Sequence, residues 1–409
     1  MAKRVIVVGA GMVGLATAWH LQERGFEVQV LERREVAAGA SWGNAGWLSP
    51  GLAIPLNEPS LVRSGILSMA RPNSPLYVPP KLDRELWRFL AEFASKCTMR
   101  AWSRSMEAIV GLSEISLAAF DELSGSVGVP TYEAPIVAGF RKEAEAAGLI
   151  HEFDLIRKSG VKLETRELGP SARSEYPLLS GAVGFAVAIE RQRYIEPAAY
   201  VNALAKAVVD RGGDLVISGT VFSVDRRKGQ IELDAAHGTG YRADAAVLAT
   251  GAWLNPLARQ VGVREPVRAG RGYSMTYKTE EPPKSPVYFP AERIACTPTG
   301  SRLRVAGTME FRRPDDPLDR RRVDSIVRSA ESLLATVDWS TQEDVWVGPR
   351  PVSADGRALI GRTAMEGVYV AGGHGMWGVT LGPITGKLLA GVIDTGEVPA
   401  VLAPFNPLR

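Results

Sequence analysis

Residues 4–32, which read RVIVVGAGMVGLATAWHLQERGFEVQVLE, decide the fold of this chain. The β-branched run from Val5 to Val8 is typical of a strand that is buried on both faces of a parallel sheet. Apolar residues then recur at helical spacing from Met12 to Arg24, and a second strand, Val28 to Leu31, ends at Glu32. This order predicts a strand, a helix and a second parallel strand, with glycines at the turn into the helix.

The turn between the first strand and the helix has the sequence GAGMVG, residues 9–14. Gly9 allows a tight turn, Gly11 lets the backbone approach a pyrophosphate, and Gly14 lets the helix pack closely on the strand. Glu32 follows Gly9 after 23 residues, near the spacing at which an acid accepts hydrogen bonds from ribose hydroxyls. The pattern predicts a dinucleotide site, and the acid disfavours the 2′-phosphate of NADP.

Two further glycine-rich turns favour FAD over NAD. One is ATGAW, residues 249–253, after a strand predicted from Ala245 to Leu248. The other is AGGHGMWG, residues 371–378, which follows a strand that begins at Val368 and leads into a helix ending near Val392. A long cofactor that lies across the sheet can place its flavin at this second helix N-terminus, where the helix dipole stabilises the anionic reduced ring. NAD requires neither turn.

The parallel-sheet pattern recurs at the start, the middle and the end of the chain, with other elements inserted between. Further helices are predicted at residues 83–123, 141–158, 197–211 and 319–337. Short strands at residues 273–277, 287–289, 294–297 and 303–307 indicate an antiparallel meander, with a hairpin turn at residues 299–301. We therefore predict an FAD-binding domain from residues 1–50, 191–265 and 345–409, and a substrate domain from residues 51–190 and 266–344.

The composition is that of an ordinary globular protein. Of 409 residues, 45% are hydrophobic and 23% charged, which excludes disorder and fibrous repeats. A net charge of +3 gives no sign of a nucleic-acid partner. Cys97 and Cys296 have no metal-site spacing, so we predict two free buried thiols and no metal. No apolar run approaches the ~20 residues of a membrane span, which predicts a cytoplasmic protein, with peripheral contact to the membrane left open.

Five motifs together resemble one family. They are GAGMVGLATAWHLQERGFEVQVLER, ASWGNAGWLSPG, LATGAW, GPRPVSADGRALIG and GGHGMWGVTLGPITG, in this order over almost the whole chain. This set resembles the D-amino-acid oxidase superfamily of FAD-dependent oxidoreductases and, within it, the bacterial D-amino-acid dehydrogenases of the small-subunit type. The resemblance implies an α/β fold: a glutathione-reductase-type, Rossmann-like FAD domain, joined to an α+β substrate domain with an antiparallel or mixed sheet.

The cofactor residues follow motif by motif. The phosphate turn, the ribose acid and the ATGAW turn predict contacts from Gly9, Gly11, Met12, Val13, Gly14, Glu32, Arg33, Thr250, Gly251 and Trp253. Two interpretations of Arg33 are equally well supported by the sequence: a solvent-exposed surface charge and a contact to the adenosine. The resemblance adds, for the ribityl chain, the flavin ring and the adenine, Ser41, Asn44, Ala45, Gly46, Val221, Gly375, Trp377, Gly378, Val379 and Thr380. We expect the FAD to be non-covalent, because neither cysteine lies in a flavin motif and no histidine lies in residues 33–60.

The best candidate for a substrate anchor is Arg350, in the segment Gly348-Pro349-Arg350-Pro351. The planar guanidinium can pair with a carboxylate through two hydrogen bonds, and the resemblance implies this role. The alternative is a structural ion pair. No general base is evident: His374 is one possibility, and a local structural role is another. Candidates for the walls of the pocket are Trp47, Tyr273, Tyr288 and Met376.

The resemblance implies oxidative deamination of D-amino acids, with transfer of a hydride from Cα to flavin N5 and release of a 2-oxo acid and ammonia after hydrolysis of the imine. Alternatives are an oxygen-using amine oxidase of the glycine or sarcosine type and a dehydrogenase of cyclic imino acids such as proline or hydroxyproline. The electron acceptor, a quinone or O₂, and the oligomeric state stay open. The apolar stretch from Leu52 to Pro80 is either a loop of the substrate domain with a short helix or a docking surface for a membrane or partner protein. The absence of a tyrosine in residues 294–298, and Met376-Trp377 where some relatives have an arginine, favour an apolar pocket.

Overall fold

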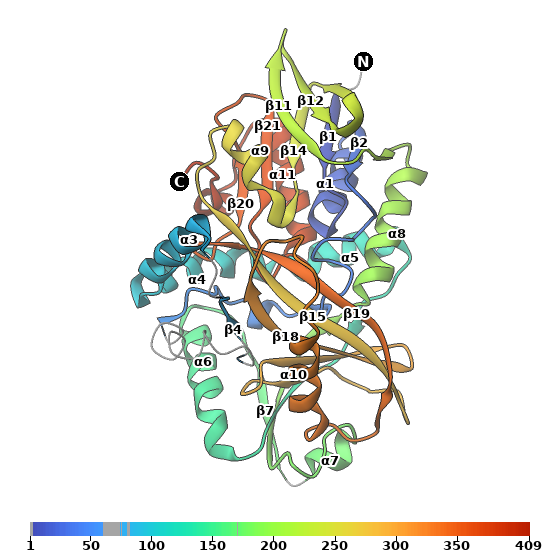
Figure 1. The fold of residues 1–409 in the computed structure, drawn as a ribbon, viewed down its shortest axis with the longest axis vertical. Coiled ribbons are helices and arrows are strands. Elements are labelled where there is room, and N and C mark those ends of the chain that lie inside the picture. Colours follow the sequence, from blue (N-terminus) through green and yellow to red (C-terminus); the bar gives the residue numbers. More distant parts are fainter. Residues whose placement is uncertain (1–2, 60–73, 75, 80–81, 170) are drawn as a thin grey trace.

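Two large sheets build the protein, and the computed structural model describes residues 3–59, 74, 76–79, 82–169 and 171–409 (Figure 1). The first sheet defines what we call the parallel-sheet domain. In spatial order its six strands are β10 (Asp214–Ile217), β2 (Glu27–Glu32), β1 (Arg4–Val8), β14 (Ala245–Leu248), β21 (Val368–Gly372) and β20 (Leu359–Arg362). The first five are parallel, and β20 is antiparallel to β21. The expected βαβ unit is therefore the centre of this domain.

Both faces of the sheet are covered, because alternate side chains of β1 enter two different cores. Val5 and Val7 face the helices on one side, whereas Ile6 and Val8 face a small sheet and α9 on the other. The helices of the first side are α1 (Met12–Glu23), α5 (Ser116–Val127), α8 (Pro197–Asp210) and α11 (Gly382–Thr395). The second side has α9 (Asn255–Gln260), β11 (Val221–Arg227), β12 (Gln230–Ala235) and β13 (Gly240–Ala243).

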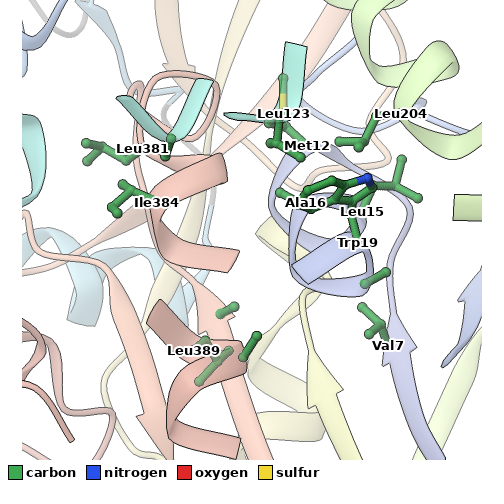
Figure 2. Packing of buried hydrophobic residues seen from close by; sticks show 14 of the residues in the cluster. Val7, Met12, Leu15, Ala16, Trp19, Leu123, Leu204, Leu381, Ile384 and Leu389 are labelled. Atoms are coloured by element: carbon green, nitrogen blue, oxygen red, sulfur yellow. The ribbon is translucent and has the colours of Figure 1, made fainter. Parts of the chain in front are cut away.

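Helix α1 is the centre of the first core (Figure 2). Its residues Met12, Leu15 and Trp19 pack among side chains of α5, α8 and α11. Helix α11 crosses α1 so closely that a Cβ on Gly386 would lie 2.6 Å from the Ala16 carbonyl carbon. This contact fixes the start of α1, and with it the turn at residues 9–14.

The second large sheet defines the mixed-sheet domain, in the lower half of Figure 1. Its strands, in spatial order, are β19 (Val337–Ser353), β15 (Val267–Thr279), β18 (Arg302–Phe311), β17 (Ile294–Thr299), β16 (Val287–Phe289), β6 (Ile136–Phe140), β8 (Phe185–Ile189) and β7 (Thr165–Leu168), and β4 (Leu76–Tyr77) pairs with β18. Most neighbours are antiparallel, but β16 with β6 and β18 with β4 are parallel. The sheet is thus mixed, which is one of the two forms expected from the resemblance. The two-residue turn between Thr299 and Arg302 closes the expected hairpin.

The remaining elements are short strands and helices around these two sheets. The other α-helices are α3 (Arg84–Lys96), α4 (Met99–Glu114), α6 (Ala147–Lys158), α7 (Ala172–Glu175) and α10 (Arg320–Glu331). A separate three-stranded sheet consists of β3 (Trp47–Leu48), β9 (Arg193–Tyr194) and β5 (Tyr132–Glu133). The 3₁₀ segments are η1 (Pro50–Leu52), η2 (Glu143–Ala146), η3 (Ala236–Gly238), η4 (Gly251–Trp253) and η5 (Ala400–Phe405).

Four sequence predictions differ from the structure. The helix expected at residues 83–123 is three helices, and Thr98 caps the second by accepting a hydrogen bond from the Ala101 amide. Helices α4 and α5, expected in the substrate domain, bury Ile109, Leu112 and Phe120 in the core around α1. The helix expected at residues 319–337 ends at Glu331, because the chain then turns into β19. Strand β19 runs straight through the expected domain boundary at residue 345 and belongs to the mixed sheet up to Ser353.

The proposed docking stretch, Leu52 to Pro80, falls largely outside the described residues. Within the part of the chain that the structure describes, no helix combines the length and the apolar character needed to cross a bilayer. Cys97 and Cys296 are both free and buried. Burial raises the pKa of the Cys97 thiol to about 11 and also raises the pKa of the Cys296 thiol.

We expect the substitution Gly386→Ala to destabilise the protein by about 1–3 kcal/mol, because the added methyl group overpacks the contact between α1 and α11. The midpoint of urea unfolding measures this loss. Gly125→Ala is the matched control: Gly125 lies in α5, an added Cβ meets nothing within 4 Å, and alanine favours a helix by up to about 1 kcal/mol. Equal effects of both substitutions would contradict the packing assigned to Gly386.

A second prediction concerns His20 of α1, whose side chain is only 3% exposed. Burial lowers the pKa of His20 from 6.5 to about 4 in the folded protein. Between these values the unfolded chain binds a proton that the folded chain does not, so stability falls as the pH falls. We expect the free energy of unfolding to drop between pH 7 and pH 5 by about 2 kcal/mol more in the wild type than in His20→Gln. Parallel pH profiles for the two proteins would contradict this expectation.

Candidate active site

A long groove follows the carboxyl ends of β1, β2, β14 and β21, which is where open parallel sheets bind ligands. It encloses about 1480 Å³ of empty space, part of it open to solvent. Its walls contain most of the predicted cofactor residues: Gly9, Gly11, Met12, Val13, Gly14, Glu32, Arg33, Ser41, Asn44, Val221, Thr250, Gly251, Trp253, Gly375, Gly378 and Val379.

The phosphate turn has no room for side chains at two of its glycines. Gly9 has a φ of +113°, and a Cβ there would lie 2.5 Å from the Ala249 carbonyl oxygen. A Cβ on Gly14 would overlap the Gly9 carbonyl oxygen. The amide of Met12, in the first turn of α1, donates to the Ser41 hydroxyl at 3.2 Å. The structure thus gives Ser41, expected beside the ribityl chain, a second role in ordering the start of α1.

Glu32 lies at the end of β2, next to the phosphate turn. One carboxylate oxygen accepts a hydrogen bond from the Ala10 amide at 2.8 Å, and the other from the Arg33 amide at 2.7 Å. The oxygen bonded to Arg33 also accepts from the Arg34 amide at 3.1 Å, so both of its lone pairs are used. The oxygen bonded to Ala10 keeps one lone pair for a ribose hydroxyl. Its position therefore suits the predicted contact.

A loop of the mixed-sheet domain contacts the groove wall at Arg33 and Trp253. The Arg33 guanidinium lies 4.0 Å from the centre of the Trp253 ring and 3.1 Å from the Asp315 carboxylate. The Trp253 indole also donates to Asp315, at 2.7 Å. Burial opposes ionisation of Asp315, but these hydrogen bonds hold its pKa below the usual value. Asp315 has no motif around it, and sequence reasoning missed it.

The mixed sheet also holds the turn at residues 42–44, which borders the opposite end of the groove. The Ser274 hydroxyl donates to the Gly43 carbonyl at 2.8 Å. The buried Arg304 guanidinium donates to the carbonyls of Trp42 and Asn44, at 3.1 and 3.2 Å. These bonds set the position of Asn44 in the groove wall from the other domain.

Two buried polar atoms in the groove walls fit a bound cofactor, because neither has a hydrogen-bond partner within the described part of the protein. They are the hydroxyl oxygen of Thr250 and Nδ1 of His374. Buried polar groups are normally hydrogen-bonded, so a ligand with donors and acceptors belongs here. Together with the phosphate turn and the fixed Glu32 carboxylate, these atoms match an FAD that extends along the whole groove.

His374 is a buried and weakly basic imidazole. Its Nε2 lies 3.0 Å from the Thr385 hydroxyl, and burial lowers the pKa of the imidazole to about 4. The side chain is therefore neutral at physiological pH. This arrangement supports the local role that the sequence left open for His374.

Arg350 is the one residue of the mixed sheet's edge strand that brings a charge into the groove wall. Its Nη1 donates to the Thr308 carbonyl at 3.1 Å, and no carboxylate of a described residue pairs with it. Burial lowers the pKa of the guanidinium to about 10, so the side chain still carries its charge at neutral pH. The structural ion pair considered from the sequence is absent among the described residues.

The four residues predicted to form the walls of the substrate pocket lie in different parts of the structure. Met376 lines the groove, but Tyr273 does not: its hydroxyl donates to Glu310 at 2.6 Å in the core beneath the sheet. Trp47 and Tyr288 also lie outside the groove walls and meet edge to face, 5.6 Å apart. The alternation of side chains along β15 turns Tyr273 to the buried face, which the sequence pattern alone did not decide.

Four predicted cofactor residues lie behind the groove rather than in its walls. Gly46, with Ala45 before it, turns the chain at a φ of +78° towards Trp47. Trp377 donates through its indole to the Ile54 carbonyl at 2.7 Å, and the Thr380 hydroxyl donates to the Trp47 carbonyl at 2.9 Å. These residues connect the groove to the segment that follows the 42–44 turn.

Comparison with known proteins agrees with this geometry. The D-amino acid dehydrogenase of Granulibacter bethesdensis is 28% identical over 404 residues, which cover 96% of each chain. That of Methylobacterium nodulans is 29% identical over 407 residues, 97% of this chain and 96% of the relative.

Solved structures share the fold. Glycine oxidase from Geobacillus kaustophilus superposes with a TM-score of 0.78 at 23% identity, over 100% of this chain and 99% of that one. L-proline dehydrogenase from P. horikoshii superposes with a TM-score of 0.70 at 18% identity, over 100% of this chain and 97% of that one. The model of the family described as FAD dependent oxidoreductase matches residues 4–392, and the chain therefore belongs to this family.

Proposed function

We propose that the protein oxidises D-amino acids to 2-oxo acids and ammonia, with FAD as the cofactor. The observation that carries this proposal is Arg350, a charged guanidinium in the groove wall with no carboxylate partner among the described residues. A buried charge without a counter-ion is costly, so the site favours an anionic ligand. The substrate class is supported by the curated relatives named D-amino acid dehydrogenase.

An α-amino acid offers the group that Arg350 fits. A guanidinium binds a carboxylate through two parallel hydrogen bonds, which fixes the orientation of the whole molecule as well as its position. Anchoring the carboxylate leaves the Cα–H bond in a defined direction, which is the main requirement for hydride transfer. Bound FAD supplies the acceptor of that hydride.

The groove residues hold the cofactor in this proposal without a covalent bond. The phosphate turn receives the pyrophosphate and Glu32 the ribose. The end that carries the flavin lies against Asn44, His374, Gly375, Met376, Gly378 and Val379. Neither Cys97 nor Cys296 lines the groove, which supports non-covalent binding.

Two alternative activities have a specific basis. Structural neighbours include a glycine oxidase and an L-proline dehydrogenase, which keeps an oxygen-using amine oxidase and a cyclic imino acid dehydrogenase as the second candidates. The acceptor that removes electrons from the reduced enzyme is accordingly O₂ or a quinone.

Replacement of Arg350 by lysine tests the anchor. Lysine keeps the charge but loses the planar fork, so we expect kcat/KM for amino acids to fall roughly 30- to 1,000-fold, about 2–4 kcal/mol, mainly through KM. The purified variant should remain yellow, since Arg350 is not needed to hold the phosphates. Arg242→Lys, at an exposed ion pair with Glu232, is the control and should not change KM. Normal turnover by the Arg350 variant would refute the anchor.

Anaerobic mixing with a panel of D-amino acids, glycine, sarcosine and proline separates the substrate classes. We expect D-amino acids to bleach the flavin absorption fastest, because the proposal places them at Arg350. Re-admission of air then measures the reaction with O₂: slow return of colour indicates a dehydrogenase, and rapid return indicates an oxidase. Fastest bleaching by proline or sarcosine would favour the alternatives instead.

A further inference from the structure

Gly272 of β15 lies directly beneath the Arg350 side chain. A Cβ on Gly272 would overlap the guanidinium, and it would be almost equally close to Cζ, Nη1 and Nη2. Because the distances to these three atoms are nearly equal, an added Cβ would lie against the flat face of the guanidinium. The guanidinium therefore rests on the bare backbone of Gly272. No positive φ requires a glycine at this position, so the reason for it is space.

A β-bulge fixes one edge of the same guanidinium. Arg271 pairs with Glu310 and Tyr273 pairs with Gly307, so the two residues Thr308 and Met309 of β18 face the single residue Gly272. Thr308 has a φ of +58°, which is unusual for a β-branched residue, and its carbonyl accepts from Arg350 Nη1. Bulges of this kind commonly re-aim groups beside active sites.

Together these two features restrain Arg350 without neutralising it. An acidic neighbour would hold the guanidinium by occupying its hydrogen-bond donors, but the only hydrogen bond from a described residue uses one N–H of five. The flat face is blocked by Gly272, one edge is held by the Thr308 carbonyl, and the remaining donors are left for a ligand in the groove.

We propose that Gly272 is a positioning residue for the carboxylate anchor: it provides the space in which the Arg350 guanidinium lies flat and charged at the edge of the groove. The inference rests on the proposed function of Arg350. A side chain at position 272 displaces the guanidinium from this position, so that its free donors no longer lie where the proposed carboxylate contact requires them. Gly272 does not line the groove, so FAD binding is unaffected.

The experiment measures binding of propionate, a carboxylate without an amine to oxidise, by the change that it causes in the flavin absorption spectrum. Propionamide is the uncharged comparison ligand. We expect Gly272→Ala and Arg350→Met each to raise the Kd of propionate at least tenfold without changing that of propionamide. We expect the double variant to be no worse than Arg350→Met alone, because both substitutions remove the same interaction. FAD content should stay at the wild-type level in all three.

Gly270→Ala is the matched control. Gly270 lies two residues away on the same face of β15 and pairs with Arg350 across the strands, but a Cβ there would crowd the side chains of Val352, at 2.9 Å, and Met309, at 3.0 Å, and not the guanidinium. This variant should bind propionate as the wild type does. A Kd raised as much as in Gly272→Ala would show that any side chain on this strand disturbs the site, and would overturn the inference.

Two other results separate the inference from the proposed function. If Arg350→Met weakens propionate binding but Gly272→Ala leaves it within twofold of wild type, the positioning role of Gly272 is wrong and the anchor stands. If Arg350→Met has no effect, the anchor and the inference both fail. If Gly272→Ala does not fold, the double variant with Arg350→Met decides, because it lacks the guanidinium. Recovery of folding in the double variant supports the contact between Gly272 and Arg350, and continued failure to fold refutes it.

Discussion

The site depends on close contacts at glycines. At each of them a neighbouring backbone segment or a large side chain occupies the space that a Cβ would need. Gly9 meets Ala249 at the phosphate turn, and Gly386 meets Ala16 where α11 crosses α1. Gly43 and Gly348 both lie under the Trp346 indole, as Gly272 lies under Arg350. Close packing transmits any added volume to the neighbouring atoms. The groove and Arg350 are therefore sensitive to single added methyl groups, even at Gly272 and Gly386, which do not line the groove.

The two domains are joined at both ends of the groove by charged side chains of the mixed sheet. Arg304 is buried and has no acidic partner at ion-pair distance among the described residues, so it is held by two backbone carbonyls of the 42–44 turn. The residue is only 5% exposed, and this burial lowers the pKa of its guanidinium. At the other end Asp315 binds Arg33 and Trp253. Both domains thus contribute contacts that position the groove walls.

Most of the groove wall could be predicted because its residues are close in sequence: the turn at residues 9–14 and Glu32 belong to one βαβ unit. Arg350 could be picked out because it belongs to one short motif. The parts that could not be predicted depend on pairing between distant segments. No strand is predicted from the sequence at Gly348-Pro349-Arg350-Pro351, and proline lacks the N–H that a sheet uses, but β19 is an edge strand and tolerates the prolines. Gly272, Thr308 and Asp315 acquire their roles only from partners far along the chain.

The length of β19 has a consequence for how this enzyme can diversify. Trp346 and Arg350 lie on one continuous strand, an even number of residues apart, and point to the same side of the sheet. Loss or gain of a single codon between them would turn the guanidinium to the opposite side. A change of chain length in this stretch therefore requires a compensating β-bulge to keep the guanidinium on its side of the sheet, whereas an exchange of residue type does not.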